Sequence, residues 1–276
     1  MELFEKLTDY GEYLKENPFY QNLKINLKDF SQLDKKKIVN NPYFSVDPEM
    51  NVPFPEEMDD LIRLHFLVTS RKVTTILEIG VGKSSIVFDH ALEKNKYKYA
   101  DFVKKNLRRS NPFECHSIDN NAEWIEFTKS SNPSIKNVKF YYCTCQVSTF
   151  NDRICTLYNN IPNICPDLIY LDAPDQFSPE GNIRGISTNH PDRLPMSADI
   201  LTFEHFLLPG TLIVVDGRTA NARFLKTNLQ RNWTYQYFEE YDQHFFELIE
   251  KPLGLYNQRQ LEFCLGSEVL NTYQNS

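Results

Sequence analysis

The chain has 276 residues, 41% hydrophobic and 24% charged, which is ordinary for a globular protein with a sizeable core. Its net charge of −7 lacks the basic surplus typical of proteins that wrap nucleic acid. The N-terminus lacks the basic start and apolar core of a signal peptide, and no apolar run approaches the roughly 18 residues that cross a membrane. We therefore expect a cytoplasmic protein with no membrane span and no nucleic-acid partner.

The first part of the chain differs from the rest. Apolar residues recur at helical spacing from Leu3 to Leu14, which predicts an amphipathic opening helix. The prolines and asparagines of residues 40–57 argue against a regular element there, and residues 58–69 again show a helical pattern. The predicted division is an N-terminal helical and irregular extension, a main domain and a C-terminal extension, at 1–57, 58–250 and 251–276.

Apolar strands then alternate with helical stretches, which predicts a parallel sheet covered on both faces in an α/β fold. Helices are expected between the strands, including one over residues 147–160. Two further strands, TYQYFEE and HFFELIE, are only a few residues apart and predict a closing antiparallel hairpin. The five preceding strand candidates are 74–80, 113–119, 138–144, 167–173 and 211–217.

Six cysteines are scattered along the chain, too few for a disulfide framework at this length. Cys143 and Cys145 fall in a stretch predicted as strand, which places both side chains on one face. Neither a second cysteine pair nor a nearby histidine pair completes a zinc site. We expect reduced, buried thiols.

The stretch ILEIGVGKSS ends in Gly-Lys-Ser, as a phosphate-binding P-loop does. A P-loop also needs glycine five positions before the Gly-Lys pair, and Leu77 stands there. The dinucleotide fingerprint is met at Gly80 and Gly82, but Ser85 replaces its third glycine. Glu78 would also repel a pyrophosphate. The P-loop is excluded, and NAD remains an alternative.

A sulfonium nucleoside suits this turn better. S-adenosylmethionine carries an ammonium and a sulfonium and no phosphate, so Glu78 would attract it. The two glycines let the backbone approach a ligand closely. Ser84 and Ser85 can cap the following helix, and Asp119 at the end of the next strand can accept hydrogen bonds from both ribose hydroxyls.

Taken in order, LEIGVGKSS, HSIDNN, DLIYLDAPD and GTLIVVDG resemble class I S-adenosylmethionine-dependent methyltransferases over roughly residues 58–250. The resemblance implies a Rossmann-like three-layer sandwich with a mostly parallel seven-stranded sheet and an antiparallel last strand. It also implies cofactor-binding roles: the methionine and sugar for Glu78, Gly80 and Gly82, the ribose for Asp119, the adenine for Asn120 and the base edge for Gln146.

One departure from the family pattern is the stretch from Ala91 to Arg109, rich in lysine and arginine. It delays Asp119 beyond the usual spacing of about 20 residues. We expect it to form a solvated helix face. A docking surface for an anionic substrate is the alternative.

Acidic residues also follow the fourth and fifth strands, at Asp172, Asp175 and Asp216. Such a carboxylate can take the proton of an oxygen acceptor, and Asp172 with Asp216 can hold Mg²⁺. Some sugar and small-molecule O-methyltransferases resemble this layout, but they carry an acidic or amide residue where this chain has Gly217 and Arg218. A ligand-contacting or structural Asp172 without metal is the alternative.

A polar loop, residues 176–195, follows the fourth strand and is expected to overhang the site. His190 in this loop is a candidate base, with a surface histidine as the alternative. An anionic group on the acceptor could be bound by Arg184, Arg193 and Arg218. The remaining histidines are expected to be structural: His65, His90, His116, His205 and His244.

Together these features predict an enzyme that moves a methyl group from S-adenosylmethionine to an oxygen, or less favourably a nitrogen, of a small acceptor. The acceptor is expected to be a sugar- or nucleotide-linked compound. Two alternatives stay open: an NAD-dependent oxidoreductase on a related fold, and a nucleoside-binding protein without catalysis. A homo-oligomer is compatible with the sequence.

Overall fold

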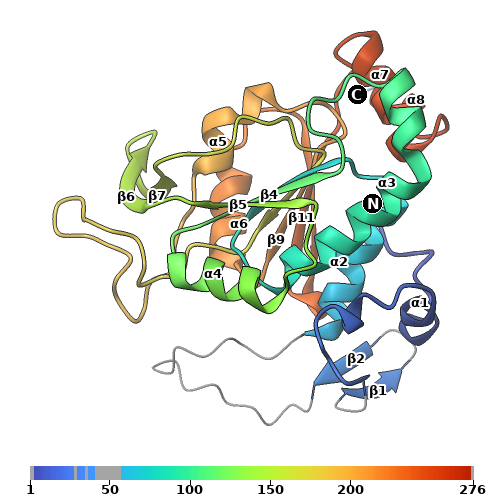
Figure 1. Ribbon diagram of the computed structural model, residues 1–276. Coiled ribbons are helices and arrows are strands. Elements are labelled where there is room, and N and C mark those ends of the chain that lie inside the picture. The colour runs from blue at the N-terminus through green and yellow to red at the C-terminus, as the bar shows by residue number, and fades with distance from the viewer. Residues whose placement is uncertain (1–2, 28–29, 35–36, 41–56, 275–276) are drawn as a thin grey trace.

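The computed structural model describes residues 3–27, 30–34, 37–40 and 57–274 (Figure 1). Its centre is a seven-stranded sheet in the order β10–β11–β9–β8–β3–β4–β5. Strand β11 runs antiparallel to both of its neighbours, and the other neighbours pair in parallel. The expected sheet with its reversed last strand is therefore confirmed. The strands are β3 Thr75–Ile79, β4 Glu114–Asp119, β5 Val138–Tyr142, β8 Leu168–Leu171, β9 Leu212–Asp216, β10 Trp233–Phe238 and β11 Gln243–Leu248.

Burial explains the apolar runs of the inner strands. Every residue of β3, β8 and β11 is buried, whereas the edge strands β5 and β10 have exposed positions. The carboxyl ends of β3, β4, β8 and β9 meet at one edge of the sheet. Strand order reverses at β3, whose neighbours are β4 and β8, and ligands of open α/β sheets bind at such a reversal.

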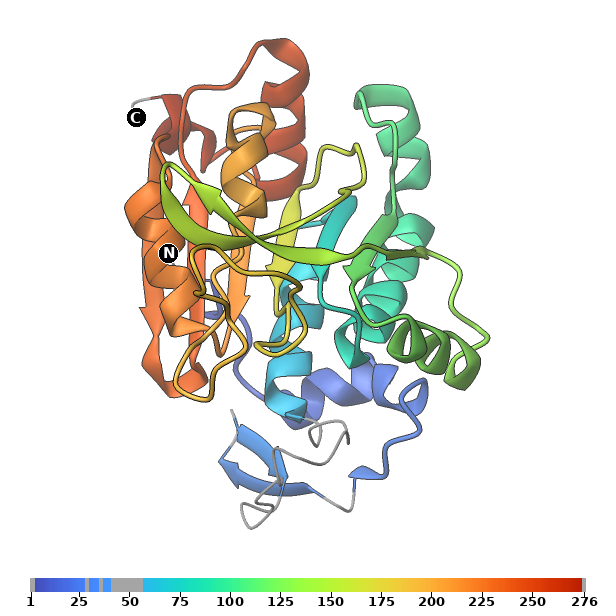
Figure 2. The same cartoon turned by 90° about the vertical axis from the view of Figure 1, so that its left-hand side faces the viewer.

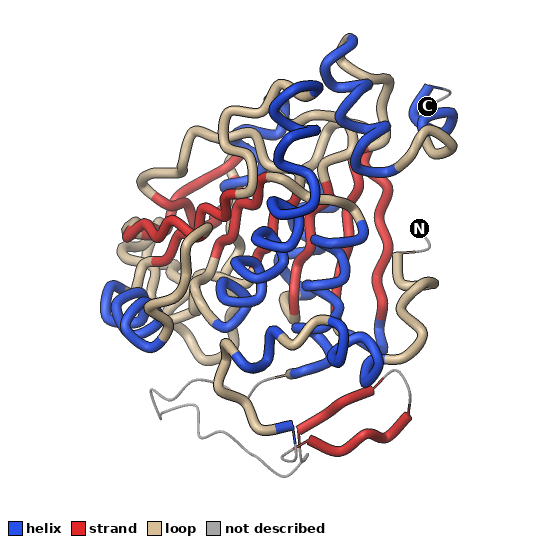
Figure 3. The backbone as a smooth tube through the Cα atoms, turned by 45° about the vertical axis from the view of Figure 1, so that its right-hand side comes forward, coloured by secondary structure: helices blue, strands red, loops and turns tan. Residues whose placement is uncertain are grey.

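Helices cover both faces of this sheet (Figures 1 and 3). On one face, α2 (Met58–Ser70) and α3 (Lys83–Asn106) pack Leu67 and Phe88 with Ile76 of β3. On the other face, α5 (Asp199–Phe203) and α6 (Thr219–Asn228) bring Ile200 and Leu225 against the sheet. Helix α4, Ala122–Ser131, lies beside β5. The short helical turns η3 and η4 span Glu204–Phe206 and Glu239–Tyr241.

One predicted helix is wrong. Residues 147–160 fall mostly in an antiparallel hairpin, β6 (Cys145–Phe150) with β7 (Arg153–Tyr158), which crosses the front of the molecule in Figure 2. Its turn residues Asn151 and Asp152 have positive φ angles of 48° and 60°, as a two-residue hairpin turn requires. The hairpin contributes buried side chains to the core on the α5–α6 face.

The cysteines agree with the expectation of free thiols. All six are free, and four of them are buried. Strand β5 ends at Tyr142, so Cys143 and Cys145 follow it rather than lying within it, and both side chains join the core beside Ile118.

The N-terminal segment packs on the outer side of α2. The predicted opening helix is shorter than expected, because α1 spans Tyr10–Glu16 and the turn η1 spans Phe19–Gln21. Leu14 and Phe19 pack with Ile62 of α2. An antiparallel pair, β1 (Phe30–Asp34) and β2 (Lys37–Asn40), follows. Most of the proline-rich stretch predicted to be irregular lies outside the described residues.

The lysine-rich stretch after Ala91 is not a separate segment. It continues α3, which is 24 residues long and ends at Asn106. At the C-terminus, α7 (Leu255–Leu265) packs Phe263 against Val103 of this long helix, and α8 (Leu270–Gln274) follows. Within the described residues, no helix combines the length and apolar character needed to cross a membrane. The limits of the two extensions stay predictions.

Candidate functional site

The chain leaves β3 through a glycine turn, Gly80-Val81-Gly82, that leads into α3. Gly80 has a φ of 115°, and a Cβ at this position would lie 3.0 Å from both the Ala173 Cβ and the Asp172 carbonyl carbon. Only glycine avoids both the backbone strain and the clash. At Gly82 a Cβ would meet only the Ser84 Oγ, at 3.9 Å, so the backbone there is open to a close neighbour.

Glu78 lies beneath this turn and is fully buried. Its carboxylate accepts hydrogen bonds from the hydroxyls of Ser84 and Ser85, each at 2.6 Å, and from the Ser117 hydroxyl. Burial raises the pKa of Glu78 to about 7, although these hydroxyls oppose the shift. Glu78 therefore ties β3 to β4 and to the start of α3, and its burial leaves no surface for the expected direct cofactor contact.

The two serines differ in what they offer a ligand. Ser85 is fully buried, and its Oγ also accepts a hydrogen bond from the Gly82 amide at 3.2 Å. Ser84 keeps 8% of its surface exposed. Ser85 thus stabilises the first turn of α3, as the capping expectation requires, rather than facing a ligand. Ser84 is the serine nearer to solvent.

Asp119 ends β4 and lies against the glycine turn. Its Oδ2 accepts a hydrogen bond from the Val81 amide at 2.9 Å, and its Oδ1 accepts one from the Asn121 amide at 2.8 Å. Burial raises the pKa of Asp119, and these amides oppose the increase. The structure thus brings Asp119 and the glycine turn together, although the long α3 separates them in sequence by more than the usual spacing.

The two residues assigned to the adenine lie farther along the same edge. Asn120 is half-buried, and its Oδ1 accepts a hydrogen bond from the Ser178 hydroxyl at 3.4 Å. Gln146 is exposed on β6, where its backbone bridges to Glu180 in the loop after β8. The hairpin, rather than the end of a sheet strand, therefore carries Gln146.

Sequence reasoning missed two side chains at this edge. The indole of Trp124 in α4 donates a hydrogen bond to the Val81 carbonyl in the glycine turn. Tyr158 at the end of β7 is buried, and its hydroxyl has no hydrogen-bond partner. The sequence offered little signal for either residue, because Trp124 reads as one position of an amphipathic helix and Tyr158 lay in the segment predicted as helix.

At the same edge of the sheet, an ion pair joins the ends of β8 and β9. Arg218, just after β9, contacts the Asp172 Oδ1 through its Nε at 3.2 Å and donates to the Asp172 and Pro174 carbonyls at 2.6 and 2.7 Å. Asp216, the last residue of β9, accepts a hydrogen bond from the Tyr170 hydroxyl at 2.6 Å. Burial and then the charge of Asp172 raise the pKa of Asp216 to about 7.

The two carboxylates of the magnesium site considered from the sequence already have partners within the protein. Magnesium prefers several oxygen ligands in an octahedron, but in the described part of the chain no three potential metal ligands converge. The Asp172 carboxylate already contacts the Arg218 cation, and Asp216 accepts the hydrogen bond of Tyr170. The assignment of Asp172 and Asp216 as a metal pair stays a prediction.

The other two catalytic candidates make their contacts within the loop after β8. The exposed Asp175 accepts a hydrogen bond from the Phe177 amide at 2.9 Å. His190 Nδ1 accepts one from the Asp192 amide at 3.1 Å, and 45% of its side chain is exposed. Gln176 donates to the His190 carbonyl at 2.9 Å, which draws the far end of the loop back toward its start. Both side chains organise the loop.

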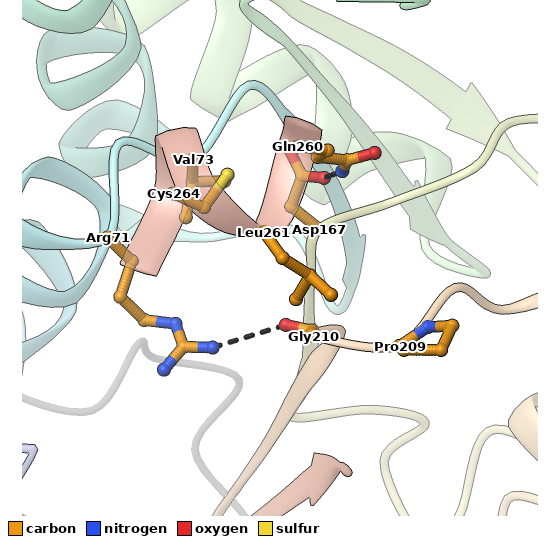
Figure 4. Close-up of a pocket in the computed structure, with 8 residues that line it drawn as sticks. All are labelled: Arg71, Val73, Asp167, Pro209, Gly210, Gln260, Leu261 and Cys264. Carbon is orange, nitrogen blue, oxygen red and sulfur yellow. Dashed lines mark hydrogen bonds between the residues drawn. The ribbon is translucent and has the colours of Figure 1, made fainter. Parts of the chain in front are cut away.

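A small pocket of about 10 Å³ lies at the opposite edge of the sheet, at the starts of β8 and β9 (Figure 4). Its polar groups have partners within the protein. Arg71 donates to the Gly210 carbonyl and to the Glu247 carboxylate, and Gln260 donates to Asp167. This pocket has room for about one water molecule and is unrelated to the site at the carboxyl edge.

No family model matches the sequence, and no curated protein matches it. Among solved structures, the chain is similar to TomG of Streptomyces achromogenes, an O-methyltransferase of tomaymycin synthesis in complex with S-adenosylmethionine. The identity is 15% over 71% of this chain and 81% of that one, with a TM-score of 0.37.

Two more structures are similar. PaMTH1 of Podospora anserina, a methyltransferase with bound S-adenosylhomocysteine, is 11% identical over 71% of this chain and 80% of that one, with a TM-score of 0.36. An O-methyltransferase of Bacillus cereus in complex with S-adenosylhomocysteine is 12% identical over 85% and 89%, with a TM-score of 0.35. Likeness at these values assigns neither an activity nor a residue role to this chain.

Proposed function

We propose that the protein is an S-adenosylmethionine-dependent methyltransferase that acts on an oxygen of a small acceptor. The observation that carries the proposal is the placement of Asp119 against the glycine turn, at the edge where strand order reverses. A carboxylate there can accept hydrogen bonds from ribose hydroxyls. Gly82 leaves the neighbouring backbone open to a ligand.

The residues present fit this cofactor. Gly80, Gly82 and Asp119 would hold its methionine and ribose parts, Asn120 and Gln146 would lie toward the adenine, and Glu78 would support the turn from below. When bound, the cofactor supplies an electrophilic methyl group on a positively charged sulfur. The acidic surroundings favour that charge.

The acceptor side supplies a base without a metal. Asp216 has a pKa raised to about 7, so its carboxylate is matched to removing a hydroxyl proton near neutral pH. Asp216 would accept the proton of the acceptor hydroxyl, and the bound cofactor would supply the methyl group to that oxygen. Arg218 fixes the end of β8 through Asp172 and so contributes to holding the reactants in line.

An NAD-dependent oxidoreductase remains the second candidate because Gly80 and Gly82 satisfy part of the dinucleotide fingerprint. Ser85 stands where the fingerprint has its third glycine, and the Ser85 hydroxyl donates a hydrogen bond to Glu78. A small, glycan-linked acceptor with an anionic group is proposed because Arg184 and Arg193 lie in the loop after β8. No nucleic-acid partner is proposed.

Calorimetry with S-adenosylmethionine, S-adenosylhomocysteine and NAD tests the cofactor. We expect binding of the first two, whereas binding of NAD alone would contradict the proposal. Methyl transfer from labelled cofactor to a panel of sugar and nucleotide-sugar hydroxyl compounds then tests catalysis. Turnover that survives exhaustive chelation is expected, and turnover that requires added Mg²⁺ would contradict the metal-free mechanism.

A further inference from the structure

Val81 is held through both of its backbone polar groups by residues at the end of β4 and in the first turn of α4. Its amide donates to the Asp119 Oδ2 at 2.9 Å, and its carbonyl accepts the hydrogen bond of the Trp124 indole. The amide belongs to the Gly80–Val81 peptide and the carbonyl to the Val81–Gly82 peptide, so both peptides of the glycine turn are engaged. One short segment of chain therefore fixes the orientation of the backbone at the candidate cofactor site.

Trp124 is itself held in place. Its backbone amide donates to the Asn121 side chain at 3.0 Å, the N-cap bond of α4. Its ring stacks on Phe127, with centroids 5.4 Å apart and planes 19° apart. Trp124 is half-buried and Phe127 is 56% exposed. The helix thus presents a fixed indole N–H to the turn while part of the stacked pair stays in contact with solvent.

The hydrogen bond determines which way the turn presents its groups. Trp124 holds the Val81–Gly82 peptide through its carbonyl, and Asp119 holds the Gly80–Val81 peptide through its amide. Rotation of either peptide would break its hydrogen bond and change the backbone angles at Val81, which the two peptides share. A site whose groups are already oriented loses less freedom when a ligand binds. Without the indole, the turn and the Asp119 carboxylate would have to be ordered by the ligand.

We propose that Trp124 is a positioning residue of the cofactor site, which holds the glycine turn and Asp119 in their ligand-binding arrangement and senses their occupation. This inference rests on the proposed function, because the ligand is taken to be S-adenosylmethionine or its product. Trp124 acts through Val81 and Asp119 rather than through the reacting atoms.

The chain has two tryptophans, so the test contains its own control. The Trp233 indole donates to the Glu204 Oε1 at 2.8 Å, and Trp233 lies on β10, at the far end of the sheet order from β4 and β5. In the ¹⁵N-labelled full chain, the two indole N–H signals can be followed by NMR during titration with S-adenosylhomocysteine. We expect the Trp124 signal to shift with the Kd found by calorimetry, while the Trp233 signal stays in place.

Two variants separate a positioning role from a purely structural one. Trp124→Phe keeps an aromatic ring but removes the donor, and we expect about 3- to 10-fold weaker binding of S-adenosylhomocysteine, the effect of losing one hydrogen bond. Trp233→Phe removes the equivalent donor far from the site and should leave this affinity unchanged. Equal affinity losses in both variants would indicate a general effect on the fold and overturn the inference.

The NMR titration of the unmodified protein tests the positioning role of Trp124 even if Trp124→Phe fails to fold. Heat of binding without any change in the Trp124 signal would overturn the positioning role and leave the proposed function intact. An absence of binding to either S-adenosylmethionine or S-adenosylhomocysteine would overturn both.

Discussion

At the scale of single residues, Asp119 is the side chain on which the cofactor assignment depends. Replacing it by alanine removes charge-assisted hydrogen bonds worth roughly 1.5–3 kcal/mol, so we expect the affinity for S-adenosylmethionine to fall about 10- to 100-fold. Calorimetry on Asp119→Ala measures this loss. Asp101→Ala, on the exposed side of α3, is the matched control. Unchanged affinity in a folded Asp119→Ala protein would remove Asp119 from the site.

Gly80 allows a second test, because two glycines in left-handed conformations differ in their surroundings. At Gly80 a new Cβ meets neighbouring atoms at 3.0 Å, whereas at Gly181, with a φ of 84°, nothing lies within 4 Å. Both alanine variants carry backbone strain of about 1–3 kcal/mol, but only Gly80→Ala adds a clash with Ala173 and Asp172. Urea unfolding should therefore show a larger loss of stability for Gly80→Ala. Equal losses in the unfolding free energy would mean that the close approach of Ala173 and Asp172 to Gly80 costs no stability.

Asp216 sets the expected pH dependence of catalysis. Its pKa is raised to about 7, and a general base acts in its ionised form, so kcat/KM should rise as the pH increases through about 7. Asp216→Asn should lower kcat by about 100-fold or more and abolish that rise. The comparison with Asp175→Asn decides between the two carboxylates. A pH profile that persists in Asp216→Asn but disappears in Asp175→Asn would assign the base to the loop.

At the scale of elements, a chain of aromatic and histidine side chains joins α1 to α2 and α3. The Tyr13 hydroxyl lies 2.7 Å from the His65 Nδ1, and the His65 Nε2 lies 2.9 Å from the His90 Nδ1. Phe19 stacks on the His65 ring at 4.8 Å. Burial, followed by neighbouring positive groups, lowers the pKa of both histidines, so the fold favours their neutral forms.

This arrangement predicts a loss of stability in mild acid. A histidine whose pKa is lower in the folded state contributes stability that is present above about pH 6.5 and is lost as the pH falls toward the folded pKa. The unfolding free energy should decrease by up to about 1.4 kcal/mol per pH unit for each histidine. Glu78 and Asp216, with raised pKa values, act in the opposite direction. The slope should therefore be compared between the wild type and His90→Gln over pH 5.5–7.5. Identical slopes would show that His90 does not contribute to the pH dependence of stability.

The elements also show what sequence patterns can and cannot predict. Apolar runs predicted the inner parallel strands because burial on both faces favours that composition, and the short separation of the last two strands predicted their hairpin. Residues 147–160 were misassigned, although their Asn-Asp pair is a hairpin turn signal, because the flanking residues fit either period. Asp119 and the glycine turn followed from the polar residues and glycines that end successive predicted strands. The Arg218–Asp172 pair and the Trp124 contact depend on how separate segments approach, which no local pattern encodes.

At the scale of the whole molecule, Arg63 joins the N-terminal segment to the sheet. It is fully buried, forms ion pairs with Asp59 and Asp60, and donates to the Tyr10 hydroxyl at 3.2 Å and to the Gln243 Oε1 at 3.3 Å. These partners come from α1, α2 and β11. The buried Arg63 guanidinium therefore joins three parts of the chain that are separate in sequence.

Removal of this charge should weaken the whole fold. Arg63→Leu leaves two largely buried carboxylates without their cation, and breaking a buried pair in this way costs about 3–5 kcal/mol. Urea unfolding measures the loss. Adding Asp59→Asn and Asp60→Asn to Arg63→Leu should recover part of it, because the unpaired charges are then gone. A loss below about 1 kcal/mol would show that solvent reaches this cluster.

The position of β11 has a consequence for synthesis of the chain. β11 lies between β9 and β10 although it follows both in sequence, so neither strand gains its final neighbour until residues 243–248 have left the ribosome. Strands β3, β4, β5 and β8 have their parallel partners earlier and can assemble first. A nascent chain stalled before Gln243 would expose the apolar edge of β9, a template for pairing with other chains. Such truncated products should therefore aggregate, whereas release after Leu248 allows the sheet to close.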